Sequence, residues 1–189
     1  DIEFTGVITD FSHTLDLAGD LDAGPVTFFY AGSSIGNFAP DEALALLERI
    51  RRLGARRGGL LIGVDVPKDH DRLVAAYDDA VGVTAAFNRN VLNHVNAILG
   101  CHFDPAAFRH VAFYNAPASR VEMHLEALRV QCVVVDGRER VFAPGEHIHT
   151  ESSHKYMPHA FAALLRRAGF SDVAVWQDEA GDFAVYYAQ

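Results

Sequence analysis

VTFFYAGSSIGNF, residues 26–38, is the stretch of sequence that decides the fold. Its first five residues are β-branched or aromatic, and the run is too short for a helix, so it predicts a buried strand. Small and polar residues follow at once, which places Gly32 to Asn37 at the carboxyl end of that strand. Open α/β sheets bind ligands at the carboxyl ends of their strands. The sequence therefore predicts that a binding site begins near Asn37.

The next segments complete a strand, helix and strand. DEALALLERIRRL, residues 41–53, has helical periodicity, and Gly54 suits the end of that helix. Its apolar face comprises Leu44, Leu46, Leu47, Ile50 and Leu53. GGLLIGVDV, residues 58–66, is a second short apolar strand that ends at Asp65. This order predicts a βαβ unit of a parallel sheet, and hence an α/β fold.

The sequence pattern changes after Asp65. Residues 69–81 and 84–99 have helical periodicity. The predicted apolar stripes are Leu73, Val74 and Tyr77 on the first helix, and Phe87, Val91, Val95 and Ile98 on the second. Two helices in series are therefore expected before the sheet pattern resumes.

Antiparallel strands are predicted next, at residues 111–115, 120–128 and 129–135, the last closed by Asp136-Gly137, a hairpin signal. A further strand pair, 140–143 and 146–151, brackets Pro144-Gly145. The chain ends with a helix over 158–168, stopped by Gly169, and strands over 173–177 and 183–187. We therefore expect three parts: residues 1–67 as a partial core, 68–154 as an inserted α+β lobe, and 155–189 completing the core.

Composition excludes several classes of function. The chain has 189 residues, of which 50% are hydrophobic, a net charge of -9 and a pI near 5.5. Non-specific nucleic-acid binding needs clustered Lys and Arg, so no nucleic-acid partner is expected. No apolar run approaches ~20 residues and no signal segment is visible, so no membrane partner is expected. Cys101 and Cys132, the only cysteines, fit a reducing compartment and predict a cytoplasmic protein.

Two groups could bind a cofactor. Asp10 and Phe11 follow the apolar segment at the start of the chain, where an acidic side chain can accept hydrogen bonds from adenine and Phe can stack on its ring. The alternative is an ordinary loop Asp and a core Phe. Gly32 lets a ligand approach the backbone, and the Asn37 amide both donates and accepts. The alternative for this loop is a helix cap at Asn37 or Asp41.

Two further groups could bind a substrate or a metal. Tyr77 could bind a substrate through its hydroxyl, or be a core residue with one hydrogen-bond partner. EHIHTESSHKY, residues 146–156, would place His147, His149 and Glu151 on one face of a regular strand. Two imidazoles and a carboxylate suit a non-haem iron or zinc site, so a metal-dependent, cupin-like enzyme is one alternative.

Five separated motifs carry a resemblance: GSSIGNF (32–38), VAAYDDAVGVTAAFNRNVL (74–92), RHVAFYN (109–115), RVEMHL (120–125) and HTESSHKY (149–156). With these in order, the chain resembles the ergothioneine-pathway L-histidine Nα-methyltransferases from about residue 5 to 187. The resemblance implies methyl transfer from S-adenosylmethionine to the α-amine of histidine, yielding hercynine. It also implies a class I methyltransferase Rossmann-like core with an inserted substrate-binding lobe.

The resemblance assigns cofactor and head-group roles to four residues. Asp10 and Phe11 match the family's GDF segment, which faces the adenine of the cofactor, although Thr9 stands in place of its glycine. Apart from these four, Gly32 is a candidate cofactor contact because a ligand can approach its backbone. Asn37 and Tyr77 match the residues that hold the amino-acid head group, and they are the candidate catalytic residues because they orient the reacting amine.

The resemblance places the substrate side chain elsewhere. Met123, in RVEMHL, would line the side-chain pocket. Glu151 and Ser153 match the pair that binds the imidazole, so Glu151 is a substrate ligand in this reading and no metal is required. A relative specific for tryptophan would be expected to carry an apolar residue at position 151, so Glu151 favours histidine.

The family's glycine-rich cofactor loop and acidic ribose contact are not found in this sequence. Class I methyltransferases have the strand order 3-2-1-4-5-7-6, in which residues 4–8, 26–30 and 59–64 would be strands 3, 4 and 5, and residues 173–177 and 183–187 strands 6 and 7. Strands 1 and 2 would then be lacking. We expect a companion N-terminal part, a second copy or a rearranged first segment to cover the open edge. A non-catalytic binding fragment is the third alternative function.

Overall fold

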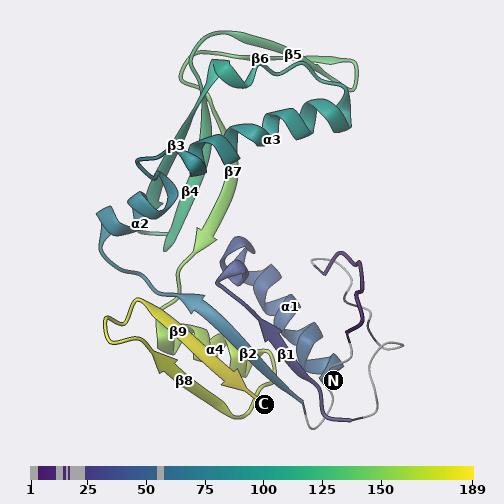
Figure 1. The fold of residues 1–189 in the computed structure, drawn as a ribbon, viewed down its shortest axis with the longest axis vertical. Helices are drawn as coiled ribbons and strands as arrows, with labels where there is room; N and C mark the ends of the chain where they lie inside the picture. Colours follow the sequence, from purple (N-terminus) through teal and green to yellow (C-terminus); the bar gives the residue numbers. More distant parts are fainter. Residues whose placement is uncertain (1–3, 12–14, 16, 18–23, 55–57) are drawn as a thin grey trace. The chain divides into compact units, whose positions relative to one another are not determined.

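The structure is a computed structural model that describes residues 4–11, 15, 17, 24–54 and 58–189 (Figure 1). The chain divides into two compact units. We call Asp1–Val66 with Tyr156–Gln189 the core unit and Pro67–Lys155 the inserted unit. Each unit is described by itself. Within the described residues, no helix combines the length and apolar character needed to cross a bilayer.

The core unit is built on a four-stranded sheet with the order β1-β2-β9-β8. The strands are β1 Thr27–Tyr30, β2 Gly59–Asp65, β8 Val173–Gln177 and β9 Phe183–Ala188. β1 and β2 run parallel, whereas β9 is antiparallel to both β2 and β8. This confirms the predicted βαβ unit and the predicted 4-5-7-6 order, and with it the mixed α/β fold of a class I methyltransferase.

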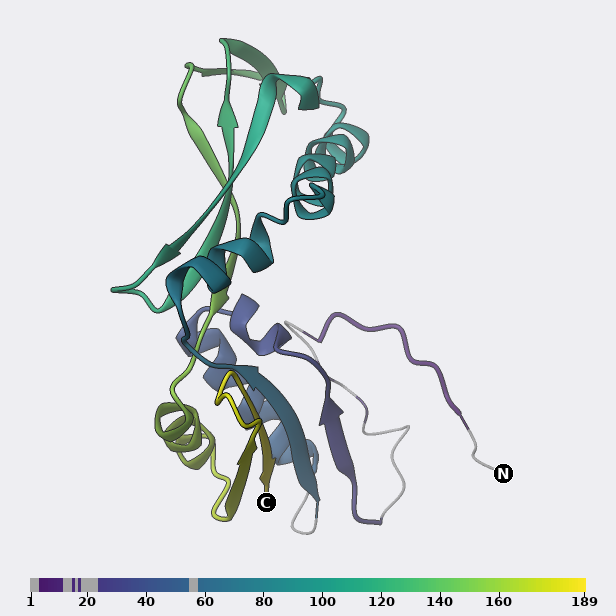
Figure 2. The same cartoon turned by 60° about the vertical axis from the view of Figure 1, so that its left-hand side comes forward.

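Two helices, α1 Pro40–Leu53 and α4 Pro158–Arg167, pack against each other and against the sheet (Figure 2). Each begins with Pro at its first turn, where the missing N–H costs no hydrogen bond. The core between them and the sheet includes Leu47, Phe161 and Tyr186, all fully buried. These helices therefore fix the sheet and the loop that precedes α1.

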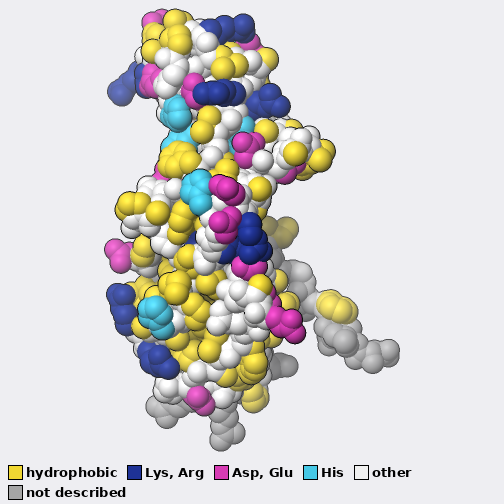
Figure 3. Space-filling view, turned by 90° about the vertical axis from the view of Figure 1, so that its left-hand side faces the viewer, with side chains coloured by type: hydrophobic (Ala, Val, Ile, Leu, Met, Phe, Trp, Pro, Cys, Tyr) yellow, Lys and Arg dark blue, Asp and Glu magenta, His cyan; other side chains and the backbone are white. Residues whose placement is uncertain are grey.

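β1 is not the buried strand that its composition predicted. Phe28 and Tyr30 pack against the core, but Phe29 on the opposite face is 72% exposed. Trp176 on β8 is likewise exposed on this unit, and the space-filling view shows apolar side chains gathered over it (Figure 3). Among the described residues β1 pairs only with β2, so it is an edge strand with one covered face.

The prediction of a strand over residues 4–8 is wrong. Residues 4–10 form no helix or strand, and both Phe4 and Ile8 are exposed. A β-strand is held by ladder hydrogen bonds to a neighbour, and no described strand pairs with this segment. Its apolar residues alone therefore do not make it a strand.

The inserted unit has two helices and a sheet of order β3-β4-β7, with a separate β5-β6 hairpin. Its elements are α2 His70–Tyr77, α3 Val83–Leu99, η3 Pro105–Ala107, β3 Phe108–Asn115, β4 Arg120–Ala127, β5 Gln131–Val135, β6 Arg138–Phe142 and β7 His147–His154. Asp136 and Gly137 both have positive φ, which confirms the predicted hairpin turn. Asp69 is the N-cap of α2, and its carboxylate accepts hydrogen bonds from Asp71 N and Arg72 N.

Two predictions for this unit are wrong. The buried residues of α3 are Asn88 and Leu92, whereas Phe87 and Ile98 of the predicted stripe are 63% and 78% exposed. The residues around Pro144-Gly145 do not form a strand pair, because β6 pairs with β5 and β7 pairs with β4. In both cases, packing partners distant in sequence decided which residues pair or become buried.

One prediction follows from how closely the loop after β1 approaches β2. A Cβ at Gly63 would lie 2.6 Å from the Gly32 carbonyl oxygen and 2.7 Å from the Phe183 ring. We expect Gly63→Ala to lower the free energy of unfolding by about 1–3 kcal/mol in urea denaturation, because the backbone must shift. Gly24→Ala is the matched control, since its Cβ would meet nothing within 4 Å. Equal urea midpoints for the two variants would contradict this packing.

Candidate functional site

The loop after β1 is anchored on β2. Ser33 Oγ accepts a hydrogen bond of 2.8 Å from Asp65 N, and Ile35 and Gly36 of η1 Ser34–Asn37 are buried. This anchoring leaves Gly32 and Asn37 exposed at the carboxyl end of β1. Gly32 has φ +66, which favours glycine, and a Cβ there would meet nothing within 4 Å. The loop therefore offers open backbone and an exposed amide.

Phe11 lies beside two aromatic rings of the core unit. Its ring centroid is 6.2 Å from that of Tyr30 and 6.3 Å from that of Phe38. A cavity of about 530 Å³ adjoins it, with a mainly apolar lining that includes Val7, Phe11, Leu15, Phe28, Tyr30 and Leu46. Asp10, next to Phe11, is exposed and also makes contacts of its own. An apolar, ring-lined cavity suits a flat aromatic group such as adenine.

Three polar side chains of the inserted unit form one hydrogen-bonded cluster. Tyr77 Oη, at the end of α2, donates to Ser153 Oγ of β7 over 2.8 Å. The Lys155 ammonium donates to Tyr77 Oη at 2.8 Å and to Ser153 Oγ at 3.0 Å. Ser153 and Lys155 are only 4% and 3% exposed. Tyr77, predicted as a candidate from sequence, thus lies directly beside the predicted imidazole ligand Ser153.

A β-bulge in β7 decides which side chains share a face of the sheet. Met123 of β4 pairs with Glu151, but the next residue, His124, pairs with His149, so Thr150 is an extra residue. Thr150 Oγ1 donates to the Met123 carbonyl at 2.9 Å. Cross-strand partners lie on the same face, and neighbours along a strand lie on opposite faces. Glu151 therefore lies on the face of Met123, and His149 lies on the other.

The face of Met123 and Glu151 is the one that the helices cover. Ser153 pairs with Val121, two residues from Met123, so it shares this face with Glu151. Burial raises the pKa of the Glu151 carboxyl, and the charge of Lys155 only partly offsets this. The predicted substrate residues Met123, Glu151 and Ser153 thus lie together on one face, with Tyr77 contacting it from α2.

The main chain of Tyr77 is fixed by a second set of hydrogen bonds. Asn88 Nδ2 contacts His110 Nδ1 at 2.9 Å and donates to the His124 carbonyl at 3.1 Å. His110 Nε2 lies 2.7 Å from the Tyr77 carbonyl oxygen. Since Asn88 Nδ2 can only donate, His110 Nδ1 accepts and its Nε2–H donates to Tyr77. This network, buried at Asn88, holds the end of α2 on β3.

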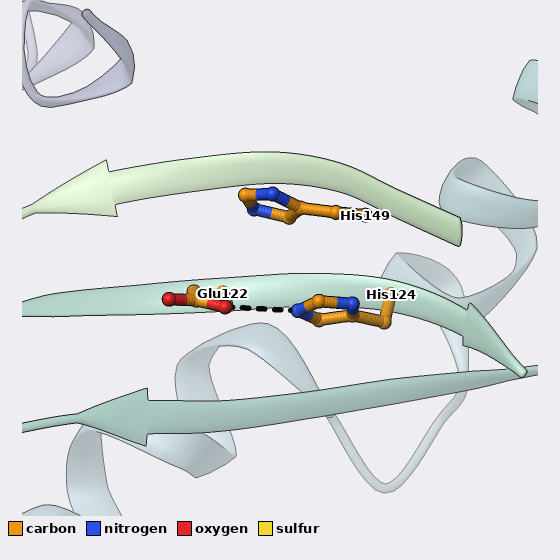
Figure 4. Close-up of side chains that lie close together, drawn as sticks. All are labelled: Glu122, His124 and His149. Atoms are coloured by element: carbon orange, nitrogen blue, oxygen red, sulfur yellow. Dashed lines mark hydrogen bonds and ion pairs between the residues drawn. The ribbon is translucent and has the colours of Figure 1, made fainter. Parts of the chain in front are cut away.

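The opposite face of the sheet carries a different cluster (Figure 4). Glu122 Oε2 lies 3.0 Å from His124 Nε2, while Asn115 and Arg120 donate to its Oε1. Burial opposes ionisation of Glu122, but these hydrogen bonds and the charge of Arg120 outweigh it and lower the pKa to about 2. Burial lowers the pKa of His124, although Glu122 opposes that shift. At neutral pH this cluster is a carboxylate beside a neutral imidazole.

The alternative metal centre of His147, His149 and Glu151 is not supported by the structure, because the bulge places Glu151 on the opposite sheet face from the two histidines. Glu122, His124 and His149 do lie close, with ligand atoms within 4.8 Å of one another. However, the rings of His124 and His149 stack with centroids 4.6 Å apart and planes 15° apart. A metal lies in the plane of each imidazole that binds it, and two nearly parallel, stacked planes share no such point. The cluster is therefore an aromatic stack, which Phe113 extends on the other side of His124.

Sequence reasoning missed three residues of the inserted-unit site. Lys155 lies inside the HTESSHKY motif, two residues after Ser153, and this spacing on a strand signals a shared face. Asn88 and His110 gave no such signal, because their contact joins α3 to β3. Asp10, Phe11, Gly32 and Asn37 belong to the core unit, and Tyr77, Met123, Glu151 and Ser153 to the inserted unit.

Comparison with known proteins gives concordant results. A family model described as histidine-specific methyltransferase, SAM-dependent, matches residues 1–189. A histidine N-alpha-methyltransferase of Mycolicibacterium smegmatis is 42% identical over 189 residues, covering 99% of this chain and 58% of that protein. Its counterpart in Mycobacterium tuberculosis is 39% identical over 198 residues, covering 99% and 58%. The chain thus spans 58% of the length of these relatives.

A more distant relative and a solved structure also match. Ergothioneine biosynthesis protein 1 of Schizosaccharomyces pombe is 24% identical over 189 residues, covering 98% of this chain and 24% of that protein. The CcbJ methyltransferase from Streptomyces caelestis superposes with a TM-score of 0.49 at 14% identity, over 97% of this chain and 62% of that chain.

The stacked geometry of His124 and His149 leads to a prediction about metal content. We expect the purified full-length protein to carry well under one equivalent of iron, zinc or manganese by elemental analysis. A chelator should leave the midpoint of thermal unfolding unchanged, because no bound ion stabilises the fold. Stoichiometric metal that is lost in His149→Ala and kept in the control His159→Ala would overturn this reading of the cluster.

Proposed function

We propose that this chain, which belongs to the histidine-specific, SAM-dependent methyltransferase family, forms part of an enzyme that methylates the α-amine of L-histidine to hercynine. The observation that carries the proposal is the placement of Glu151, Ser153 and Met123 on one sheet face with Tyr77. We also propose that the inserted unit is the substrate-binding lobe, with boundaries near residues 68 and 154. The core unit would then hold the cofactor.

The residues of the core unit fit the adenine end of the cofactor. S-adenosylmethionine, when bound, supplies an electrophilic methyl group. Phe11 offers a partly exposed ring beside an apolar cavity, and Asp10 is an acceptor for an amino group. Gly32, with open space where a Cβ would stand, lets a ligand approach the backbone. These are the cofactor contacts that we propose for this chain.

Asn37 and Tyr77 would orient the amino-acid head group. A free α-amine is largely protonated at neutral pH, since the reference pKa is roughly 7.7 to 8 in peptides and is higher in free amino acids. The reacting form is the neutral amine, so the site must accept it with its lone pair directed at the methyl group. Tyr77 Oη donates to Ser153 and accepts from Lys155, which leaves one lone pair for the amine. Orientation of this kind contributes several kcal/mol to catalysis.

Glu151 and Ser153 would recognise the imidazole, with Met123 packing on the ring. The Glu151 carboxylate accepts from a ring N–H, and Ser153 bonds the second ring nitrogen. A site whose buried polar groups pair with the substrate rejects analogues that lack those groups. This polar pair, rather than the size of the pocket, would select histidine.

The uncovered surfaces of the core unit support a proposal about its partner. β1 is an edge strand with Phe29 exposed, and the relatives are longer than this chain. We propose that an additional N-terminal part, or a second copy, covers this edge and the apolar sheet face. The two cysteines are free thiols, which supports a cytoplasmic location.

The assignment of Glu151 predicts the effect of its removal. Glu151→Ala in the full-length enzyme should weaken histidine binding by about 2 to 3 kcal/mol, roughly 30- to 150-fold in Kd, because a charge-assisted hydrogen bond is lost. Titration calorimetry measures this change. His149→Ala is the matched control on the opposite sheet face and should leave the Kd unchanged. Equal affinities for the wild type and Glu151→Ala would refute the assignment.

The uncovered edge predicts how the isolated chain behaves. We expect the 189-residue chain alone not to bind S-adenosylmethionine measurably, because the family's glycine-rich loop and ribose contact are not in its sequence. We also expect it to self-associate through the edge of β1. Calorimetry with the cofactor and light scattering test both parts. Micromolar binding by a monomer would contradict both.

A further inference from the structure

Lys155 is a buried cation with a fixed position in the inserted unit. Its side chain is 3% exposed, and its ammonium lies 4.7 Å from the centroid of the Tyr77 ring. Ser119 makes two hydrogen bonds to its main chain. Lys155 N donates to Ser119 O, and Ser119 Oγ donates to Lys155 O, each at 2.8 Å. The ammonium therefore reaches Tyr77 and Ser153 from an anchored main chain.

Two hydrogen bonds of this cluster end on Ser153 Oγ. An ammonium has donors only, whereas a hydroxyl has one donor and two acceptor lone pairs. Ser153 Oγ accepts from Lys155 at 3.0 Å and from Tyr77 at 2.8 Å, so both of its lone pairs are used. Its own hydrogen must then be donated to another group. Ser153 is thereby fixed as a donor toward a ligand.

We propose that Lys155 is a positioning residue that fixes Ser153 as a hydrogen-bond donor, so that the pocket accepts the imidazole of histidine only in its neutral form. This inference rests on the proposed function. Ser153 donates to the unprotonated ring nitrogen, and Glu151 on the same sheet face accepts from the ring N–H. An imidazolium has N–H donors at both nitrogens, and Ser153 has no lone pair left to accept one.

Other ionisable groups lie near the cluster. Glu151 lies on β7 with Ser153 and interacts with the charge of Lys155. Tyr77 comes from α2, and His110 of β3 bonds the Tyr77 carbonyl. Glu122 of β4 lies on the opposite sheet face. The test therefore includes a second ligand whose ring stays neutral over the pH range used.

The experiment compares two ligands on the wild-type full-length protein at pH 7.5 and pH 5.5. Histidine loses its neutral ring over this range, because an unperturbed imidazole has a pKa of about 6.5. The 1,2,4-triazolyl analogue of histidine keeps a neutral ring with both an N and an N–H. Both ligands carry the same α-amine, so the change that the analogue shows reports the amine and the protein groups together. We expect the histidine Kd to rise about tenfold more than the analogue Kd between the two pH values, in proportion to the loss of neutral ring.

Variants then test the part that Lys155 plays. In Lys155→Met, one lone pair of Ser153 is released, so Ser153 can accept from an imidazolium, and the excess rise of the histidine Kd over the analogue Kd should fall below about threefold. Lys155→Arg retains a donor-only cation and should restore the tenfold excess. Ser152→Ala, on the opposite face of β7, is the matched control and should behave as the wild type. If a variant fails to fold, the comparison of the two ligands on the wild type still tests the inference.

The outcomes separate this inference from the proposed function. A wild type that binds neither histidine nor the analogue overturns the proposed function and this inference with it. A wild type whose histidine Kd rises no more than the analogue Kd overturns the inference alone. The same holds if Lys155→Met retains the full tenfold excess of the wild type.

Discussion

The β-bulge at Thr150 is the constraint on which the inserted unit's site depends. Without it, His147, His149, Glu151 and Ser153 would all lie on one face of β7. The extra residue reverses the alternation, so Glu151 and Ser153 turn to the helix-covered face while the histidines stay on the other. The hydrogen bond from Thr150 Oγ1 to the Met123 carbonyl secures the irregular register. Bulges of this kind commonly redirect side chains next to functional sites.

Local patterns predicted most of the fold correctly. The run at residues 26–30, the helix after Asp41 and the strand before Asp65 form the βαβ unit that their periodicities indicate. Such patterns report period and length, and these are local properties. They do not report which strand pairs with which, so the segment 4–8 was predicted as a strand although no described strand pairs with it.

The parts of the site that sequence missed depend on contacts distant in the chain. The rule of alternation assumes an unbroken ladder, so it could not anticipate that Thr150 is extra, and it placed His149 and Glu151 on one face as an alternative metal site. On α3, Asn88 is buried, and its side-chain amide donates hydrogen bonds to His110 Nδ1 and to the His124 carbonyl, whereas Phe87 is exposed. Hydrophobicity alone would have ranked these two residues the other way.

The two carboxylates on neighbouring strands differ in what compensates their burial. Asn115, Arg120 and His124 all bond Glu122, so its carboxylate is satisfied within the protein and its pKa falls to about 2. For Glu151, burial outweighs the charge of Lys155 and the pKa is raised. A carboxylate whose desolvation the protein compensates only in part is destabilising until a donor reaches it.

A ligand N–H that bonds Glu151 would supply that missing compensation, whereas Glu122 already has donors from three residues of the protein. The difference explains why the carboxylate of Glu151, on the helix-covered face, is suited to recognition and that of Glu122, on the opposite face, to structure. The bulge determines which of the two environments Glu151 enters. In the absence of ligand, the positive charge of Lys155 compensates part of the charge of the Glu151 carboxylate.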